Sequence, residues 1–593
     1  MTSQGSPYRA PRDDNSSFCK PSRSELGKVF VENQSRASAT SQPAWIKALR
    51  TQARLEVTRA AVEYAGSYLP NEILQESNLL TNLSSQDGPA KDTANDIAKQ
   101  PVWIIGGHQP ELFHPGVWYK NFLIDSVAKE LRAQGRSALG LHVIIDHDLA
   151  KSLSIKVPSR RTFEENLKPR TMDWLESNGT GRSIITESIR LPLASASQNQ
   201  PPIPWHLHRL DPDQVPEFLT RLERGMESLG LPLPMARNYF RQAADHSSAD
   251  DSIAGCSETP TATTRDAATS LSVARHWIEA QHGLRNIDLP MGRICETEAW
   301  FRFVERCLER AQELSEIYNQ ALLEYREQEK ITNPGQPVPS LGRDGDWVEL
   351  PFWLYRLRDS KRSRMWVREQ GCIVGSGPNP NELVWTKSVG PEGLVAAREA
   401  WLADGVCLRP RALMTTLFLR CFLADGFVHG IGGGVYDRLT DTIIARFLGI
   451  EPPSYAVATA TLHLNLAEDT RRVIDGLDVG LSQSRQRCHD LRSRPERFLD
   501  LRDNQQSGLA SAHAELLRSI PPRGQKKEWH HRMVELKREI RRSIEGIEQS
   551  ERERYMQLQL RVQELRGLLS REYSMVLFGE DDCISRLKRL SNG

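Results

Sequence analysis

The chain has 593 residues, a formal net charge of +1 and 26% charged residues. A chain of this length is too long to fold around one simple hydrophobic core, so we expect roughly two to four structural units. The near-zero net charge excludes an overall field that would favour nucleic acid or an anionic membrane as partner. No stretch approaches the roughly eighteen apolar residues of a membrane span, and the first residues lack the apolar core of a signal peptide. We therefore expect a soluble cytoplasmic protein with no nucleic-acid and no membrane partner.

Cysteine usage agrees with that compartment. The nine cysteines are spread along the chain, and no two of them are spaced as Cys-x-x-Cys. Neither a zinc ribbon nor a disulfide framework is therefore predicted. Reduced thiols are typical of the cytoplasm.

Residues 1–100 are expected to wrap the surface as a partly disordered N-terminal segment. Residues 1 to about 45 are rich in Ser, Asn, Gln and charge, and this composition predicts no regular element. Apolar residues at helical spacing over 45–68 predict a helix. Residues 76–100 are polar and broken by Gly and Pro, which indicates a loop.

A strand–helix–strand unit over 102–156 carries the first candidate site. An apolar, β-branched run ends at Gly107, a helical pattern follows over 117–131, and a second strand covers 141–145. Ligands of open α/β sheets bind beyond the carboxyl ends of the strands, so the loops after both strands should meet. The alternative is that the aspartates cap a helix and the histidines are satisfied loop residues. The candidate catalytic residues are His108, Gln109, Lys120, Asp146, His147 and Asp148.

The middle of the chain predicts helical and hairpin insertions into an α/β core. Residues 194–204 have the composition of a linker, and 246–270 that of a disordered insertion. The periodicity predicts strands at 152–157 and 182–189, helices at 214–229, 271–281 and 297–327, and hairpin strands at 347–358 and 365–374.

The second candidate site follows a predicted helix over 411–423 and a short strand over 426–429. The glycine-rich turn 430–434 then precedes a helix over 435–448. Free amides at such a helix N-terminus favour a phosphate or carboxylate. The alternative is a tight helix–strand crossing that needs glycine for close packing. The candidate binding residues are Gly107, Arg409, Gly430, Gly432, Gly433, Gly434 and Tyr436.

Residues 466–593 predict a C-terminal helical domain. Apolar residues recur at three and four residues over 526–569, which indicates one coiled-coil helix about 65 Å long. Its partner is either the antiparallel pair 468–491 and 510–520, with a turn at 521–524, or a second copy of the chain. A homodimer through the coiled coil is thus expected. The whole chain predicts a doubly wound, Rossmann-like α/β core over 101–465, with this coiled coil following it.

The order of these motifs resembles that of the bacillithiol biosynthesis cysteine-adding enzymes, a family of cysteine ligases. Gly107-His108-Gln109, followed by Phe113 and Lys120, is similar to the family's Gly-Gln-Gln motif with its Tyr and Lys. Asp146-His147-Asp148 resembles the end of its Glu-Asp-His-Asp motif. Further similarity lies in residues 349–353, 408–410 and 430–436 and in the long C-terminal helices.

Three positions depart from the family pattern, so the chain is identified as a divergent member. His108 stands where the family has Gln, Ile145 replaces the first Glu of the second motif, and the turn at Gly430 lacks the family's acid. The substrates of this protein could therefore differ from those of the family.

The resemblance implies a ligase that joins the carboxyl group of cysteine to the amine of an amino-sugar conjugate, glucosaminyl malate in the family. An amide forms from these groups only after activation, so ATP is the implied cofactor. The glycine turn would hold phosphate or carboxylate, His108 or His147 would deprotonate the amine, and Asp146 or Asp148 would orient that imidazole. Lys120 and Arg409 would offset developing negative charge.

Two other functions stay open. A metal could bind among His108, His114, Asp146, His147 and Asp148, but adjacent side chains diverge on a strand, so no tight metal site is predicted. A non-catalytic scaffold could instead bind a nucleotide or sugar and dimerise through its coiled coil.

Overall fold

A computed structural model describes the protein over residues 8–76, 100–150, 152–162, 182–193, 202–231, 234–245, 265–357, 362–368, 373–375, 386–388, 393–464 and 468–593. The expected loop at 77–99, linker at 194–201 and insertion at 246–264 lie outside these ranges. The chain divides into two compact units. The core unit consists of Met1–Val157, Ser188–Leu462 and Arg571–Gly593, and the helical unit of Pro158–Glu187 and His463–Ser570.

The core unit is a mixed α/β structure around a mostly parallel, six-stranded sheet, as the sequence predicts. Only its first strand, at one edge, runs antiparallel to its neighbour. The order across the sheet is β1 (Ser16–Lys20), β16 (Ala456–Thr461), β15 (Gly426–His429), β2 (Val102–His108), β3 (Ala138–Ile144) and β8 (Ile287–Pro290).

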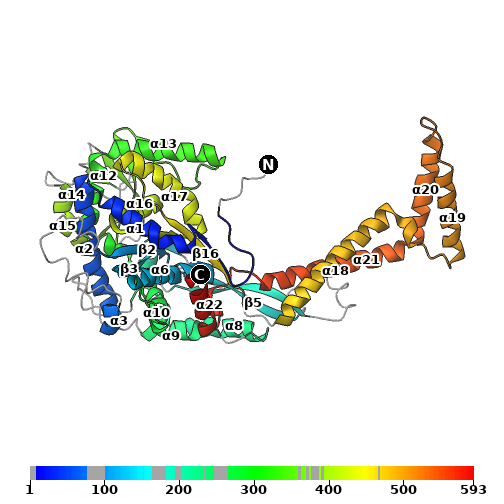
Figure 1. Ribbon diagram of the computed structural model, residues 1–593, viewed down its shortest axis with the longest axis horizontal. Helices are drawn as coiled ribbons and strands as arrows, with labels where there is room; N and C mark the ends of the chain where they lie inside the picture. Colours follow the sequence, from blue (N-terminus) through cyan, green and yellow to red (C-terminus); the bar gives the residue numbers. More distant parts are fainter. Residues whose placement is uncertain are drawn as a thin grey trace. The chain divides into compact units, whose positions relative to one another are not determined.

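Helices cover both faces of this sheet, which is why its central strands are apolar throughout. Trp103 and Ile105 point to the face packed by α2 (Ala44–Gly66). The alternate position, Gly106, faces Ile124 of α6 (Pro115–Ala133), which packs on β2, β3 and β16 (Figure 1). The further helices of the core unit are α3 (Asn71–Glu76), α8 (Val215–Glu227), α9 (Ala236–Asp245), α10 (Ala267–Gln281), α11 (Met291–Ile294), α14 (Gly393–Ala396), α15 (Arg398–Ala403) and α22 (Glu580–Asn592).

The expectation of an irregular segment before residue 45 is wrong for residues 16–37. β1 pairs with β16, and α1 (Leu26–Ala37) packs on α6, β2 and β15. Phe30 of α1 is fully buried. An edge strand needs few apolar side chains. Residues 16–20 can therefore pair with the sheet although their sequence has little of the apolar pattern that predicts a strand.

The insertions follow the sequence-based prediction closely, with three differences. Residues 265–270, expected to be disordered, lead into and begin α10, because Asp266 caps it by accepting from the N–H of Thr269. The expected helix over 297–327 is two helices, α12 (Glu298–Glu309) and α13 (Ala311–Glu329). The predicted strands are present as β5 (Ser152–Thr162), β6 (Arg182–Pro192) and β10 (Trp347–Arg356), with β14 (Val406–Pro410) pairing with β10. The expected single strand over 365–374 is two strands, β11 (Ser363–Arg368) and β12 (Ile373–Gly375), which pair antiparallel with each other.

The helical unit contains two pairs of helices. α18 (Glu468–Ser493) runs antiparallel to α21 (Glu545–Leu568) (Figure 1). The order of the contacts shows this direction: Asp478 pairs with Arg566, and Ser484, further along α18, donates to Glu551, which is earlier in α21. α19 (Asn504–Arg518) packs on α20 (Lys527–Ser543). The expected single helix over 526–569 is therefore wrong: it breaks at Ile544, where its partner changes from α19 to α18.

A buried ion network joins β15 to α2 and gives the first prediction. The fully buried Asp425 carboxylate lies 2.6 Å from Arg50 and 2.7 Å from Arg54, and accepts from the N–H of Trp103 at 2.8 Å. Asp425→Asn leaves two buried guanidinium groups without a carboxylate, so it should lower the urea-unfolding free energy by about 3–5 kcal/mol. Glu451→Gln, which removes the exposed partner of Arg36, should cost less than about 1 kcal/mol. Equal costs for the two variants would contradict this account.

Candidate functional site

The order of the central sheet reverses next to β2. β3 and β8 follow β2 on one side, whereas β15 and β16 lie on its other side. Open α/β sheets bind ligands outside the strand ends at such a reversal. A cavity of about 570 Å³, which we call the first cavity, opens there and is lined by the carboxyl ends of β2 and β15.

Two helices begin at this cavity. α6 starts at Pro115, and its cap His114 accepts from the N–H of Gly116 at 3.1 Å through Nδ1. That acceptor role requires a neutral ring, and burial together with Arg571 lowers the pKa of His114 to about 4. α17 (Ile431–Ile443) starts from Gly430. Both N-termini direct a positive dipole end at the cavity, which favours an anion. The first-turn amides of α17 are also free to donate, whereas those of α6 already donate to His114.

The start of α17 corrects the expected turn. The helix was predicted from residue 435, but the glycines form its first turn, whose amides need no helical partner. Glycine is required at 433 because a Cβ there would lie 2.7 Å from His429 Nδ1. Gly434, expected to bind a ligand, instead packs on Val457, and its carbonyl accepts from Tyr455.

Most of the predicted site residues do lie together. Gln109 Nε2 donates to Asp148 at 2.8 Å, and the N–H of Ile145 donates to the carbonyl of His108 at 3.0 Å. The loops after β2 and β3 are therefore side by side, as the strand rule predicts. The first cavity is lined by Gly107, His108, Gln109, Lys120, His147, Asp148, Gly430, Gly432, Gly433 and Tyr436.

Asp146 and Arg409 do not join this group. They line a second cavity of about 490 Å³ beyond the ends of β3 and β8. The Asp146 carboxylate accepts from the N–H of Gly292 at 3.0 Å. The loop after β3 thus forms part of both walls, because it turns at residues 146–148 and places Asp146 in the second cavity and His147 and Asp148 in the first.

Neither histidine predicted as the base is oriented by a carboxylate. The buried His147 bonds through Nε2 to the carbonyl of Pro410, and its Nδ1 lies 3.7 Å from Asp146, too far for a hydrogen bond. His108 Nδ1 lies 3.1 Å from the carbonyl of Gln109. Burial and the nearby Lys120 lower the pKa of His108 to about 3, so it is neutral and weakly basic.

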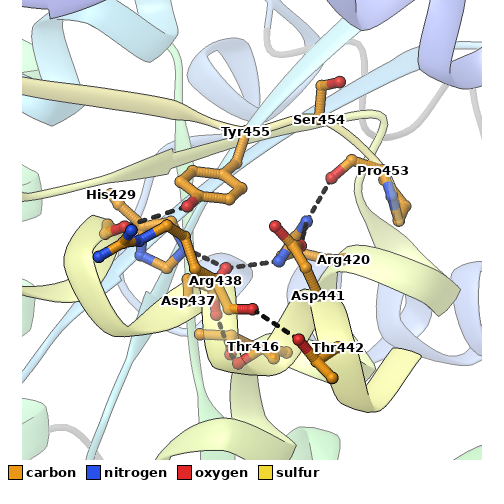
Figure 2. A network of polar contacts seen from close by, with 12 residues as sticks. Thr416, Arg420, His429, Asp437, Arg438, Asp441, Thr442, Pro453, Ser454 and Tyr455 are labelled. Atoms are coloured by element: carbon orange, nitrogen blue, oxygen red, sulfur yellow. Dashed lines mark hydrogen bonds and ion pairs between the residues drawn. The ribbon is translucent and has the colours of Figure 1, made fainter. Parts of the chain in front are cut away.

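A histidine–aspartate pair lies at the first cavity instead, at the end of β15. His429 Nε2 lies 2.7 Å from Asp437, which also accepts from Thr416 at 2.8 Å and from Arg420 at 2.6 Å (Figure 2). Burial opposes the charge of Asp437, but His429 and Arg420 hold its pKa well below the usual value. An ionised carboxylate only accepts, so Nε2 carries the ring proton and Nδ1 keeps a lone pair.

Two cations complete the cavity. Lys120 is buried, and its Nζ donates to the carbonyl of Gly107 at 3.0 Å. Burial lowers its pKa to about 8. Arg571 donates to Thr459 at 2.7 Å and lines the same wall as Gly116. Three carboxylates also line the cavity. Asp437 pairs with Arg420 and Asp148 with Arg362, and Glu572 acts on its neighbour Arg571.

Sequence reasoning gave no role to His429, Thr416 or Arg571. His429 had a usable signal: it ends a strand at the ligand edge and precedes a glycine-rich helix. Arg571 had none, because it follows the helical unit and returns to the core unit after more than a hundred residues.

Comparison with known proteins finds no protein-family model and no protein of curated function that matches the chain. The similarity to cysteine ligases thus stays a hypothesis carried by the motifs. Within the described ranges, no group of three or more His, Cys, Asp or Glu could hold a metal ion, and no helix is long and apolar enough to span a membrane.

The lowered pKa of Lys120 predicts pH-dependent anion affinity. Sulfate keeps its charge between pH 7 and 9, and the low pKa values of His108 and His114 keep both rings neutral there. Lys120 loses its proton as the pH rises through about 8, so sulfate affinity should fall by up to about tenfold over this interval. Isothermal titration measures this, and Lys120→Met should bind weakly at both pH values. A steep fall that persists in the variant would contradict the assignment.

Proposed function

We propose that the first cavity binds a phosphate- or carboxylate-bearing substrate, and that the protein is a carbon–nitrogen ligase. It joins the carboxyl group of cysteine, or a similar acid, to the amine of an amino-sugar conjugate. One observation carries this proposal: two helix N-termini, two cations and a histidine–aspartate pair line a single cavity where the sheet order reverses. The strand order also supports a doubly wound, Rossmann-like core.

Binding of an anion is supported by the hydrogen-bond donors that line the first cavity. The free amides at the start of α17, together with Lys120 and Arg571, match the oxygens of a phosphate group. These residues fit the phosphates of ATP, which when bound would supply the activation that a carboxylate needs before it meets an amine. The same donors fit the carboxylates of an acidic conjugate such as glucosaminyl malate.

His429 is the proposed proton acceptor for the substrate amine. An amine attacks a carboxyl carbon only as the free base, so its ammonium form must first lose a proton. Nδ1 of His429 faces the first turn of α17 and is the ring nitrogen left available by the bond from Nε2 to Asp437. Asp437 then stabilises the imidazolium that forms, and Thr416 and Arg420 fix the position of that carboxylate.

Free thiols support a cytoplasmic protein, since all seven cysteines in the described part of the chain are unbridged. The helical unit supports a homodimer. Val479 of α18 and Met556 and Leu560 of α21 are 57%, 47% and 52% exposed, and apolar side chains on long paired helices are typical of a coiled-coil seam between copies.

The ligase proposal is tested by incubating purified protein with cysteine and glucosaminyl malate, with and without ATP, and following the amide-linked thiol by mass spectrometry. ATP-dependent product supports the ligase. If product is absent while ATP still raises the melting temperature, the protein is a related ligase with another acceptor, because only a native-state ligand stabilises. If neither occurs, the non-catalytic scaffold is the better account.

The general base gives the next prediction. His429→Ala and Asp437→Asn should each lower turnover by about 10²–10⁴-fold, because the amine then lacks an oriented proton acceptor. The control His282→Ala removes a histidine that pairs with Glu580 away from the cavity, and turnover should stay unchanged. Melting curves verify that each variant is folded. Full turnover in folded His429→Ala would exclude this histidine as the base.

The dimer is tested by sedimentation equilibrium. The wild-type chain should sediment as a dimer, and the double variant Met556→Glu, Leu560→Glu should be monomeric, because two carboxylates would be buried in the seam. A monomeric wild-type protein would contradict the proposed dimer.

A further inference from the structure

The second cavity is distinct from the site described above. It lies beyond the ends of β3 and β8, within the core unit, and has a volume of about 490 Å³. Three arginines line it: Arg265, Arg293 and Arg409. Their state of pairing decides what the cavity can bind.

Arg409 is a buried cation without a close carboxylate. The residue is 5% exposed, and its nearest acidic group is Glu296, at 3.9 Å. Among the residues that the structure describes, its guanidinium makes one hydrogen bond, a marginal one of 3.5 Å to the carbonyl of Leu408, and its Nε has no partner. Burying a guanidinium in this way costs several kcal/mol unless an anion compensates it.

Two neighbouring buried arginines differ from Arg409, because each of them has a carboxylate within hydrogen-bond distance. Arg411, two residues along the chain, lies 2.6 Å from Glu349, and the buried Arg420 lies 2.6 Å from Asp437. Both are compensated inside the protein. Arg409 alone of these three turns to a cavity, and it belongs to β14, whose pairing with β10 fixes its position opposite Trp353.

Arg265 adds a second set of donors. It is 8% exposed, and its Nη1 is buried with no partner in the described part of the chain. Its Nη2 makes only long contacts of 3.4 Å with Ser67. Two guanidinium groups with unused donors thus line one cavity, and such forks match the oxygens of a carboxylate or phosphate.

Four carboxylates also line the cavity, and each of them already has a hydrogen-bond donor or a cation beside it. Asp146 accepts from the N–H of Gly292, and Asp266 accepts from the N–H and hydroxyl of Thr269 at 2.9 Å and 2.8 Å. Glu63 pairs with Arg293 at 2.9 Å, and Glu296 lies 3.7 Å from Arg293 and 3.9 Å from Arg409. None of these acids accepts a hydrogen bond from Arg409 Nε or Arg265 Nη1, so these two donors remain for an anion that enters the cavity.

We propose that the second cavity is a binding site for a small carboxylate- or phosphate-bearing molecule, with Arg409 as its principal contact and Arg265 as the second. The inference does not depend on the proposed ligase activity, because it uses a different cavity and different donors. The site accounts for a buried guanidinium whose nearest carboxylate, that of Glu296, lies 3.9 Å away.

The test compares Arg409→Met with the wild type in low-salt Tris buffer, with and without inorganic phosphate or citrate at millimolar concentration. Without anion, the variant should melt no lower than the wild type, since it removes an uncompensated buried charge. With the preferred anion, the wild type should gain about 2–4 °C in Tm more than the variant. Phosphate and citrate, used separately, distinguish the two ligand chemistries.

Three controls make the outcome unambiguous. Arg265→Met should also reduce the anion-induced gain, and it replaces the first variant if Arg409→Met does not fold. Arg571→Met, in the first cavity, should keep the part of the gain that depends on Arg409. An equal anion-induced gain in the wild type, Arg409→Met and Arg265→Met would overturn the proposal, as would a drop in Tm for Arg409→Met of the same size in every buffer.

Discussion

The parallel pairing of β2 with β15 is the contact on which both the sheet and the first cavity depend. It joins segments more than three hundred residues apart, with Gly426 opposite Ile104 and Val428 opposite Gly106. Asp425 secures the entry of this pair: its N–H donates to the carbonyl of Trp103 at 2.8 Å, and its carboxylate accepts from the N–H of the same residue. Since the register is fixed at one end, the polar residues at the other end meet at fixed positions.

Electrostatics divides the ligand edge of the core unit into two parts. In the first cavity, burial keeps His108 and His114 neutral, so the positive potential comes from helix N-termini, Lys120 and Arg571. In the second, the positive potential comes from Arg409 and Arg265, whose guanidinium groups each keep a buried donor without a partner in the described part of the chain. The loop after β3 contributes to both, with Asp146 toward one cavity and its neighbours toward the other.

Local patterns in the sequence predict much of this fold. The apolar run at residues 102–106 and the helical spacing over 117–131 suffice for β2 and α6, and the strand rule then brings Gln109 to Asp148. Such patterns do not show which strands or side chains pair when they lie far apart in the sequence. They do not say that residues 16–20 form an edge strand, that β14 turns Arg409 away from the glycine-rich helix, or that Arg571 returns to the core unit. The histidine–aspartate pair could have been predicted from the sequence, because residue 429 ends a predicted strand and residue 437 lies near the start of the helix that follows.

The most direct test of the account is a crystal structure of the protein soaked with tungstate, a phosphate analogue located by its anomalous signal. The account predicts a peak in the first cavity, within hydrogen-bond distance of the amides that begin α17 and close to Lys120. Tungstate confined to the protein surface, with none at the start of α17, would contradict the central claim that this cavity is built for an anionic substrate.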